Sequence, residues 1–370
     1  MKKHIIITKL YEFGGSNTHL ETLIEYHGPA NVILVLQSDE QLAYLGKIKG
    51  AENAQVQVRQ NIHPFAHLQY KFTTNVKEFF LIVWSVLMIQ AMSIKNGFAD
   101  VTICATEPER HLYMLWMPLS RVYYILHTTP ANRYTPLTPY TCNRMLGTRK
   151  KLVTVSNANK NTVCQNWEIQ PQKQRFVYVV YNCLRNDAEP LANNPETKEN
   201  KTVTTLGQVI AYKNPDTWLE VAKQVTTARP QVNFEWLGNG PLLDEYKQVT
   251  NGNNRIAFKG LVTQPGEYLK QASIYYQPSL YETHGIAVVE AMSYALPCVV
   301  SNTGGMPESV EDNYNGLLVG ATDVTGHVNA ILKLIDNESV ARQYGDNSRK
   351  KYLEMFTYQA FTGAMDKIYA

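Results

Sequence analysis

The sequence predicts an α/β protein with two doubly wound parallel sheets, and three observations carry that prediction. Short apolar runs alternate with helical patterns along nearly the whole chain, which is typical of parallel strands joined by helices. The chain has 370 residues, too many for one hydrophobic core of ordinary size. A polar stretch near the middle separates two alternating series. Such domains bind ligands at the carboxyl ends of their strands, and two in series place a cleft between them.

The first series begins with an apolar run that we interpret as a strand and not as a signal peptide, because it is very short. The first helix is expected after a turn at Gly14-Gly15, with Thr18 and Glu21 as a capping box. The strands of this half are predicted at His4–Thr8, Asn31–Leu36, Asp100–Ala105, Val122–Leu126 and Leu152–Val155.

One segment of the first half, Phe79–Met92, is strongly apolar and is flanked by Lys77 and Lys95. A helix needs roughly 20 apolar residues to span a bilayer, and this segment is shorter. We therefore predict a buried helix packed on a sheet.

The segment from Arg185 to Lys201 is polar and rich in asparagine, and we interpret it as an interdomain linker. A second series follows, with helices expected at Pro215–Thr227 and near Leu242–Val249. The end of the chain, from about Ala321, should form three helices. Strands are predicted at Thr202–Leu206, Val232–Leu237, Arg255–Phe258, Ile274–Gln277, Pro297–Val300 and Gly316–Val319.

The composition is that of a globular protein, with 44% hydrophobic and 18% charged residues. Five cysteines are scattered without a CxxC pair or a disulfide framework, which favours a reducing compartment. The net charge of +3 is unevenly divided. Residues 1–186 hold 20 Lys and Arg against 11 Asp and Glu, whereas residues 187–370 hold 15 against 21.

A basic half favours an anionic partner. Arg144, Arg149, Lys150 and Lys151 form a local cluster, which is either a solvated surface or a contact for phosphorylated lipid or an acidic membrane face. Nucleic acid is not expected, because no recognised binding motif accompanies the charge.

The most informative stretch runs from residue 278 to residue 308. It holds Glu282, a glycine turn at Gly285, Glu290 about one turn into a following helix, and then Gly304-Gly305. A helix N-terminus offers unpaired N–H groups and a positive dipole end to a diphosphate. The order of these residues suits a sugar-nucleotide pocket, with Glu290 on the ribose hydroxyls and Glu282 facing the sugar.

With these residues in view, the chain resembles the retaining GT-B glycosyltransferases of the large family usually numbered four (glycosyl transferases group 1). The likeness runs nearly end to end and is stronger in the second half. The segments that carry it are Gly14-Gly15, ILHTTP, VSNANKNTV, VVYNCL, LGQVIAYKNPDTWLEVA, WLGNGPL, PSLYETHGIAVVEAM (the E-x7-E signature) and GGMPE.

The resemblance implies a GT-B fold, with two Rossmann-like domains facing across a deep cleft. The expected boundaries are an acceptor-binding domain over 1–184, a linker over 185–201, a nucleotide-sugar domain over 202–352, and a last helix over 353–370 that crosses back to the first domain.

The resemblance also implies the site residues. Glu282, His127 and Lys213 are the candidate catalytic residues, and Gly15, Ser16 and His127 the candidate acceptor site. The candidate donor site comprises Gly15, Gln208, Lys213, Gly238, Gly240, Lys259, Glu282, Gly285, Ile286 and Glu290.

The sequence departs from the family pattern at Gln208, where arginine is usual, and more mildly at Asn214 and Cys183. Glutamine lacks the bidentate fork that arginine offers a diphosphate. Lys213 then remains the recognisable cation of that motif. This departure leaves open a second interpretation, a weakly catalytic binding subunit that supports a partner enzyme.

The implied reaction moves a sugar from a UDP- or GDP-sugar to a saccharide, lipid-linked or protein-linked glycan acceptor, with retention by front-face attack. It is expected to serve cell-surface polysaccharide or glycoconjugate synthesis. Lys213 and the N–H groups near Gly285 and Ile286 would stabilise the departing phosphate. His127 would bind the sugar or orient the acceptor, and neither it nor Glu282 is assigned as a classical base. No metal or other cofactor is expected, because no DxD-type cluster appears. The expected location is cytoplasmic, with contact to the inner face of the cell membrane.

Two other enzyme classes remain as alternatives. An NAD-dependent oxidoreductase would need a GxGxxG turn that the first loop lacks. A GT-B phosphorylase or epimerase would use similar geometry, although no context for a pyridoxal-bearing lysine is found.

Overall fold

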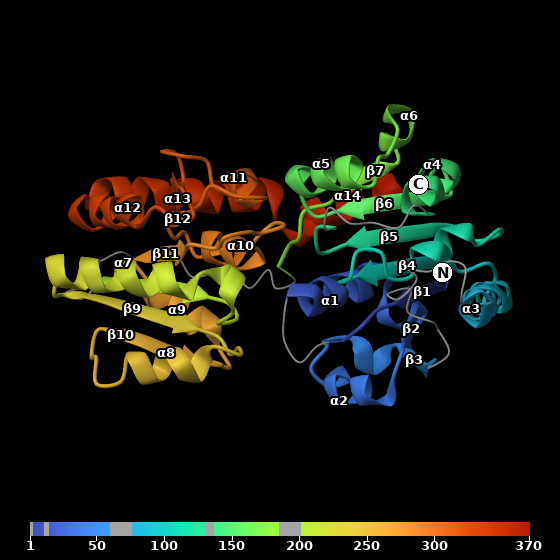
Figure 1. Ribbon diagram of the computed structural model, residues 1–370, viewed down its shortest axis with the longest axis horizontal. Helices are drawn as coiled ribbons and strands as arrows, with labels where there is room; N and C mark the ends of the chain where they lie inside the picture. Colours follow the sequence, from blue (N-terminus) through green and yellow to red (C-terminus); the bar gives the residue numbers. More distant parts are fainter. Residues whose placement is uncertain (1–2, 11–14, 60–75, 131–136, 185–200) are drawn as a thin grey trace. The chain divides into compact units, whose positions relative to one another are not determined.

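All strands in the described residues pair in parallel, in one of two sheets (Figure 1). The structure is a computed structural model that describes residues 3–10, 15–59, 76–130, 137–184 and 201–370. It divides into two compact units. Unit 1 comprises Met1–Arg185 with Phe361–Ala370, and unit 2 comprises Asn186–Ala360.

The sheet of unit 1 has seven strands in the order β3-β2-β1-β4-β5-β6-β7. Its central strands are almost wholly apolar and buried, as parallel strands covered on both faces must be. The strands are β1 (His4–Ile7), β2 (Val32–Leu36), β3 (Gln55–Val58), β4 (Asp100–Ala105), β5 (Val122–Leu126), β6 (Lys150–Thr154) and β7 (Val177–Val179).

The helices of unit 1 connect these strands, with a 3₁₀ turn over Leu112–Trp116 between β4 and β5. They are α1 (Gly15–His27), α2 (Leu42–Leu45), α3 (Val76–Lys95), α4 (Leu137–Met145), α5 (Asn157–Asn166), α6 (Pro171–Gln174) and, from the end of the chain, α14 (Tyr358–Tyr369).

The sheet of unit 2 has six strands in the order β10-β9-β8-β11-β12-β13. They are β8 (Lys201–Leu206), β9 (Val232–Leu237), β10 (Ile256–Gly260), β11 (Ile274–Gln277), β12 (Cys298–Ser301) and β13 (Gly316–Val319). The helices are α7 (Pro215–Ala228), α8 (Leu243–Val249), α9 (Pro265–Gln271), α10 (Ile286–Ser293), α11 (Met306–Ser309), α12 (Val324–Asp336) and α13 (Glu338–Met355).

The core of unit 2 is dominated by aromatic rings stacked between α7 and the sheet. Trp218 of α7 meets Trp236 with ring centroids 5.4 Å apart and Phe258 at 4.9 Å. The indole N–H of Trp218 donates to Thr205 Oγ1 at 2.7 Å, so burial leaves that polar group satisfied. This packing holds β8, β9 and β10 in register, and their carboxyl ends carry several of the predicted donor residues.

The predicted strands of both halves are confirmed to within two residues at each end, and the three helices at the end of the chain are α12, α13 and α14. Two strands were missed. β3 has the sequence QVQV and lies at one edge of its sheet, and β7 has only three residues at the other edge. Edge strands need little apolar content, so neither produces a clear apolar run.

The predicted capping box of the first helix is wrong. α1 begins at Gly15, so Thr18 lies inside the helix, where its carbonyl accepts a hydrogen bond from Thr22 Oγ1 at 2.9 Å. Glu21 accepts instead from the backbone N–H of Lys49 at 3.0 Å. Gly14 and the predicted linker up to residue 200 lie outside the described residues.

The prediction of a buried helix over Phe79–Met92 is also wrong in one respect. The segment is helical, as part of α3, but Phe79, Phe80, Trp84 and Leu87 are exposed, while only a narrow stripe that includes Ile89 is buried. Apolar content alone does not say how many faces of a helix are covered. Among the described helices, none has the length and apolar content to cross a membrane.

α14 completes unit 1. Phe361, Met365 and Ile368 are buried, and Tyr26 of α1 donates to Asp366 Oδ1 at 2.7 Å. The predicted start of the last helix, residue 353, falls instead within α13, which continues to Met355.

Candidate functional site

Lys213 and Glu282 form an ion pair beyond the carboxyl ends of two adjacent strands of unit 2. Lys213 ends a 3₁₀ turn, Ala211–Lys213, that follows β8, and Glu282 lies in the loop after β11. Burial lowers the pKa of Lys213, but the charges of Glu282 and Tyr212 and the hydrogen bond to Glu282 more than offset it, so the pKa lies above its usual value. Lys213 is therefore a fixed positive charge at neutral pH.

Glu282 is only 8% exposed, and one of its oxygens collects three donors. Besides Lys213 Nζ, Oε1 accepts from Gln277 Nε2 at 2.5 Å and from Ser279 Oγ at 3.1 Å. Tyr275 donates to Gln277 Oε1 at 2.5 Å, which orients that amide. The carboxylate is thus held in one place, with its second oxygen, Oε2, left to other donors.

Gln277, Ser279 and Tyr275 were not among the predicted site residues. The signal was present in the sequence: β11 is an apolar strand that ends in a buried glutamine, and a buried amide must have partners.

The loops after β8, β9 and β10 touch backbone to backbone. Gly238 donates to Gly260 O at 2.8 Å, and Gly207 donates to Leu237 O at 2.9 Å. A Cβ on Gly238 would lie 1.9 Å from Gly207 O, and φ there is +151°, so only glycine fits. Gly240 is equally tight, since its Cβ would meet Val209 O at 2.4 Å. Gly238 and Gly240 thus let this loop pack directly on the backbone at Gly207 and Val209, and its place beside a nucleotide stays a prediction.

Gly285 caps α10 in the left-handed conformation at φ +85°, and Ile286 is the first helical residue. The first N–H groups of a helix have no partner within the helix, so this turn presents donors and a positive dipole end. Gly304 and Gly305 pack on the loop before it: Gly305 donates to Glu282 O at 2.9 Å. The loop that carries Glu282 is therefore fixed directly before the N-terminus of α10.

Glu290 lies in α10, one turn after Ile286, and its side chain is half-buried. Burial raises the pKa of Glu290 to about 7. A carboxylate that is costly to ionise in the empty protein gains most from a ligand that donates hydrogen bonds to it, as ribose hydroxyls do.

Within unit 2, Gln208 and Lys259 are the predicted donor residues that lie outside this arrangement, and the predicted donor residue Gly15 lies in unit 1. Both side chains are exposed. Gln208 follows Gly207, beside which the Lys213 side chain passes, since a Cβ on Gly207 would lie 3.8 Å from Lys213 Cε. Lys259 lies near the end of β10. The cation that pairs with Glu282 is thus Lys213.

In unit 1, His127 follows β5 directly and lies edge-on to His19 of α1, with ring centroids 4.5 Å apart. His19 Nδ1 donates to Asn182 Oδ1 at 2.9 Å, because an amide oxygen can only accept. Burial lowers the pKa of His19 to about 4, and burial with the neighbouring ring lowers that of His127 well below 6.5. Both rings are neutral at pH 7.

Gly15 and Ser16 form the first turn of α1, one turn before His19, and so lie at the same corner of unit 1 as His127. Sequence reasoning missed His19 and Asn182, although both lie in segments that it singled out. A neutral His127 suits hydrogen bonding to a hydroxyl, and it does not suit the role of a cationic acid.

The predicted basic cluster does not form one surface. Lys150 and Lys151 are 6% and 7% exposed, and they donate to the carbonyls of Ser120 and Ile368. Burial, with Arg149 nearby, lowers the pKa of Lys150 to about 8. Both lysines thus serve the packing of unit 1, because β6 begins with them and places them at the ends of neighbouring elements.

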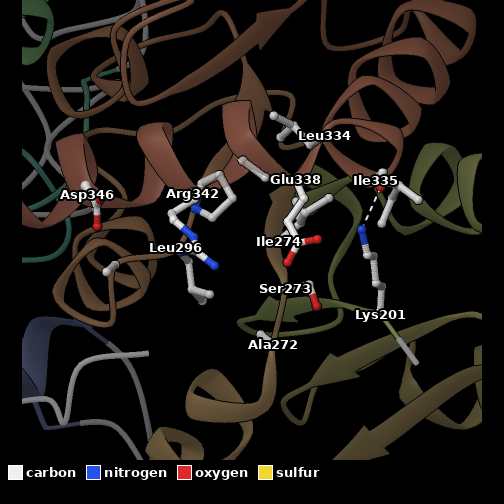
Figure 2. A pocket seen from close by; sticks show the side chains of 13 residues that line it. Lys201, Ala272, Ser273, Ile274, Leu296, Leu334, Ile335, Glu338, Arg342 and Asp346 are labelled. Atoms are coloured by element: carbon white, nitrogen blue, oxygen red, sulfur yellow. Dashed lines mark hydrogen bonds between the residues drawn. The ribbon is translucent and has the colours of Figure 1, made fainter. Parts of the chain in front are cut away.

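One cavity of unit 2 lies at the opposite end of the sheet (Figure 2). Lys201 and Ile274, the first residues of β8 and β11, line it together with Glu338 and Arg342 of α13, and Lys201 Nζ donates to Ile335 O at 2.7 Å. Doubly wound sheets bind ligands at the carboxyl ends of their strands, so this cavity is not the candidate site.

The five cysteines are buried and none forms a disulfide with another, in line with the absence of a disulfide framework from the sequence. Within the described residues, no group of three or more His, Cys, Asp or Glu side chains is placed to hold a metal ion.

Part of the chain is similar to known glycosyltransferases. Residues 188–351 match the family model described as glycosyl transferases group 1. An Escherichia coli UDP-Gal:alpha-D-GlcNAc-diphosphoundecaprenol alpha-1,3-galactosyltransferase is 27% identical over 223 residues, which cover 56% of each chain. A poly(ribitol-phosphate) alpha-N-acetylglucosaminyltransferase from Staphylococcus aureus is 26% identical over 164 residues, 43% of this chain and 33% of the relative. The chain thus aligns with about half or less of these two relatives.

Solved structures match along almost the whole chain. The crystal structure of Anabaena Alr3699/HepE in complex with UDP and glucose has a TM-score of 0.73 at 15% identity and covers 99% of this chain and 98% of that one. That of a mutant of Staphylococcus aureus TarM, in complex with UDP and other ligands, has a TM-score of 0.76 at 13% identity and covers 100% of both. These likenesses confirm the predicted α/β fold as GT-B.

Proposed function

We propose that this chain, whose residues 188–351 belong to the group 1 glycosyltransferases and whose fold is GT-B, is a retaining glycosyltransferase that uses a nucleotide sugar. The observation that carries the proposal is the buried Lys213–Glu282 pair beside the N-terminus of α10. It places one cation, one carboxylate and a set of N–H donors around the same point, which is what a departing nucleoside diphosphate and its sugar require.

The donor occupies the carboxyl ends of the strands of unit 2. Lys213 and the N–H groups at Gly285 and Ile286 bind the diphosphate, and Glu290 accepts hydrogen bonds from the ribose. UDP is the favoured nucleotide, because HepE and TarM were both crystallised with UDP. Gly238 and Gly240 allow the loop beside the nucleotide to pack closely on the neighbouring backbone.

In the reaction the anomeric C–O bond breaks, and negative charge develops on the β-phosphate while positive charge develops on the sugar ring. Lys213 and α10 stabilise the phosphate without a metal ion, and Glu282 holds sugar hydroxyls or stabilises the ring. The acceptor hydroxyl attacks from the same face and passes its proton to the departing phosphate. His127, neutral at pH 7, orients the sugar or the acceptor from unit 1, with Gly15 and Ser16 beside it.

The acceptor is a saccharide or a glycan carried by lipid or protein, in the synthesis of cell-surface polysaccharide or glycoconjugate. The name of the Escherichia coli relative specifies a diphosphoundecaprenol-linked acceptor, which favours a lipid-linked one here. We place the protein in the cytoplasm, at the inner face of the cell membrane. The weakly catalytic binding subunit that Gln208 suggested is not favoured, because Lys213 and Glu282 are both in place and these relatives are named as transferases.

A thermal-shift titration with UDP, GDP, ADP and their common sugar conjugates tests the proposal, with each variant compared with its own unliganded midpoint. A ligand that binds the folded state raises the midpoint by mass action. UDP should shift the native chain, and the shift should be lost in Glu290→Ala. It should persist in Glu338→Ala, which removes a carboxylate from the opposite end of the sheet. If no nucleotide shifts the native chain, the proposed donor site is wrong.

A further inference from the structure

Helix α3 of unit 1 carries a row of large apolar side chains on its exposed face. Phe80, Trp84 and Leu87 are 64%, 59% and 56% exposed, and Ile94 continues the same face toward the end of the helix. This spacing of four, three and seven residues follows one side of an α-helix. The outer face is therefore a continuous apolar strip that carries two large aromatic rings.

The opposite face of α3 packs on the unit through apolar residues, Ile89 and Met92 among them, and through polar ones. Ser85, Gln90 and Ser93 are buried. Gln90 donates to Ser120 Oγ at 3.0 Å and accepts from the backbone N–H of Leu119, and Ser93 Oγ donates to Ala99 O. The inner face thus anchors α3 to the unit, while a large exposed apolar patch such as the outer face marks an interaction site.

Cations border the C-terminal end of the strip. Lys95 ends α3 and is exposed. Beyond it, exposed Phe98 and Leu119 line a shallow hollow with Arg121 and Arg149, whose one acidic member, Asp100, is buried. Arg121 and Arg149 donate to the carbonyls of Tyr369 and Leu119, which fixes their positions beside the apolar residues. Apolar and cationic groups thus lie together just past the last turn of α3.

We infer that α3 is the element that lies on the membrane, with Phe80, Trp84 and Leu87 among the acyl chains and Lys95, Arg121 and Arg149 at anionic headgroups. α3 does not qualify as a membrane-spanning helix, and a helix with one apolar face and flanking cations lies in the plane of the interface. The inference deepens the proposed function, because it names the surface through which unit 1 would reach a lipid-linked acceptor.

A second copy of the chain is the rival occupant of this face. In a two-fold contact each surface meets itself, so Lys95, Arg121 and Arg149 would approach their own equivalents. An anionic bilayer neutralises these cations instead. The charge at the edge of the strip therefore favours lipid over self-association.

Flotation of the full chain with vesicles tests the inference, comparing phosphatidylcholine alone with phosphatidylcholine containing phosphatidylglycerol. The native chain should float with the anionic vesicles, and its partition coefficient should fall about tenfold or more in Phe80→Gln/Trp84→Gln. The matched control is Val249→Gln/Leu353→Gln, which removes two similarly exposed apolar side chains from unit 2. Lys95→Gln/Arg149→Gln should lose the preference for anionic vesicles.

Three results would overturn the inference: a native chain that floats with neither vesicle, equal losses in the α3 and control variants, or a native dimer that the α3 variant turns into monomer. The UDP-induced rise in melting midpoint is measured on every variant. If UDP still raises the melting midpoint but the chain does not float, the membrane inference is wrong and the proposed donor site stands. If the chain floats but UDP does not raise the midpoint, the proposed donor site is wrong and the membrane inference stands.

Discussion

Glu282 has one carboxylate oxygen surrounded by donors before any ligand arrives, and this limits what the residue can do. That oxygen already accepts hydrogen bonds from Lys213, Gln277 and Ser279, which occupy its acceptor positions. The residue is suited to hold hydroxyls or to stabilise positive charge through its second oxygen.

At the scale of single residues, the sequence predicted the groups but not their partners. Lys213 and Glu282 stand out because each belongs to a motif, whereas Gln277, Ser279 and Tyr275 matter only through contacts made in the folded unit. The burial of Lys150 and Lys151 shows the same limit. A run of basic letters predicts surface charge, but these side chains reach backbone carbonyls inside unit 1.

The raised pKa of Glu290 predicts a dependence of stability on pH. The folded-state pKa is about 7 and the ordinary value is 4.5, so the folded protein binds the proton more tightly. The free energy of unfolding should therefore fall as pH rises from about 4.5 to about 7 and stay lower above that, by about 2 to 3 kcal/mol. Glu290→Gln should remove this pH dependence. The stability of the variant relative to the native chain should therefore increase as pH rises.

Thermal midpoints of the native chain, Glu290→Gln and the control Glu338→Gln, taken from about pH 4 to about pH 8, check this. The difference in thermal midpoint between the native chain and Glu290→Gln should change across that pH range. The difference between the native chain and Glu338→Gln should stay constant. A native and a Glu290→Gln profile that run parallel would contradict the assignment of the pKa to burial of this carboxyl.

At the scale of elements, the sequence predicted strands well where they are central and apolar, and poorly where they lie at an edge. β1, β4 and β5 lie within the sheet and consist mostly of branched or aromatic residues, whereas β3 alternates glutamine with valine. Helix α1 shows a different limit: its start depends on the backbone at Gly15, and the Thr18–Glu21 spacing imitates a cap inside the helix.

Gly304 packs directly on the loop that carries Glu282, so replacing it even with alanine should have a large effect. It has φ +51°, and a Cβ there would lie 1.9 Å from Glu282 O. Gly304→Ala should move the Glu282 loop, lower stability by about 2 to 4 kcal/mol and weaken binding of UDP.

Gly252→Ala is the matched control, since that glycine has φ +79° and nothing within 4 Å of its Cβ position. It should cost about 1 kcal/mol from its backbone conformation and leave UDP binding unchanged. Thermal midpoints and UDP titrations of both variants separate the cost of the backbone conformation from the effect of the contact with Glu282. Equal behaviour of the two variants would mean that the Gly304 contact does not support Glu282.

At the scale of the whole molecule, the division into two α/β units could be predicted from the alternation of strands and helices on either side of a polar stretch. The return of the last helix to unit 1 came from the family resemblance, because nothing in the composition of that helix says which unit it covers. In the structure Arg121 and Lys151 of unit 1 donate to the last carbonyls of α14.

Deletion of residues 361–370 should therefore destabilise unit 1 and spare unit 2. The loss uncovers the surface that Phe361, Met365 and Ile368 cover, worth several kcal/mol by comparison with large-to-small core substitutions. Scanning calorimetry should show one transition lowered and the UDP-stabilised transition unchanged. The point variant Asp366→Ala, which loses only the bond to Tyr26, should shift the lowered transition slightly. Unchanged melting of the truncated chain would count against a structural role for α14.

The same helix sets the order in which the chain matures on the ribosome. All residues of unit 2 have been synthesised once the ribosome has added Ala360. Unit 1 additionally needs Phe361–Ala370. Domains usually fold as they emerge, the first one first. Here unit 1, which is synthesised first, acquires helix α14 only after unit 2 has been made. Newly made chains should therefore pass through a stage in which unit 2 is folded and unit 1 still lacks its last helix.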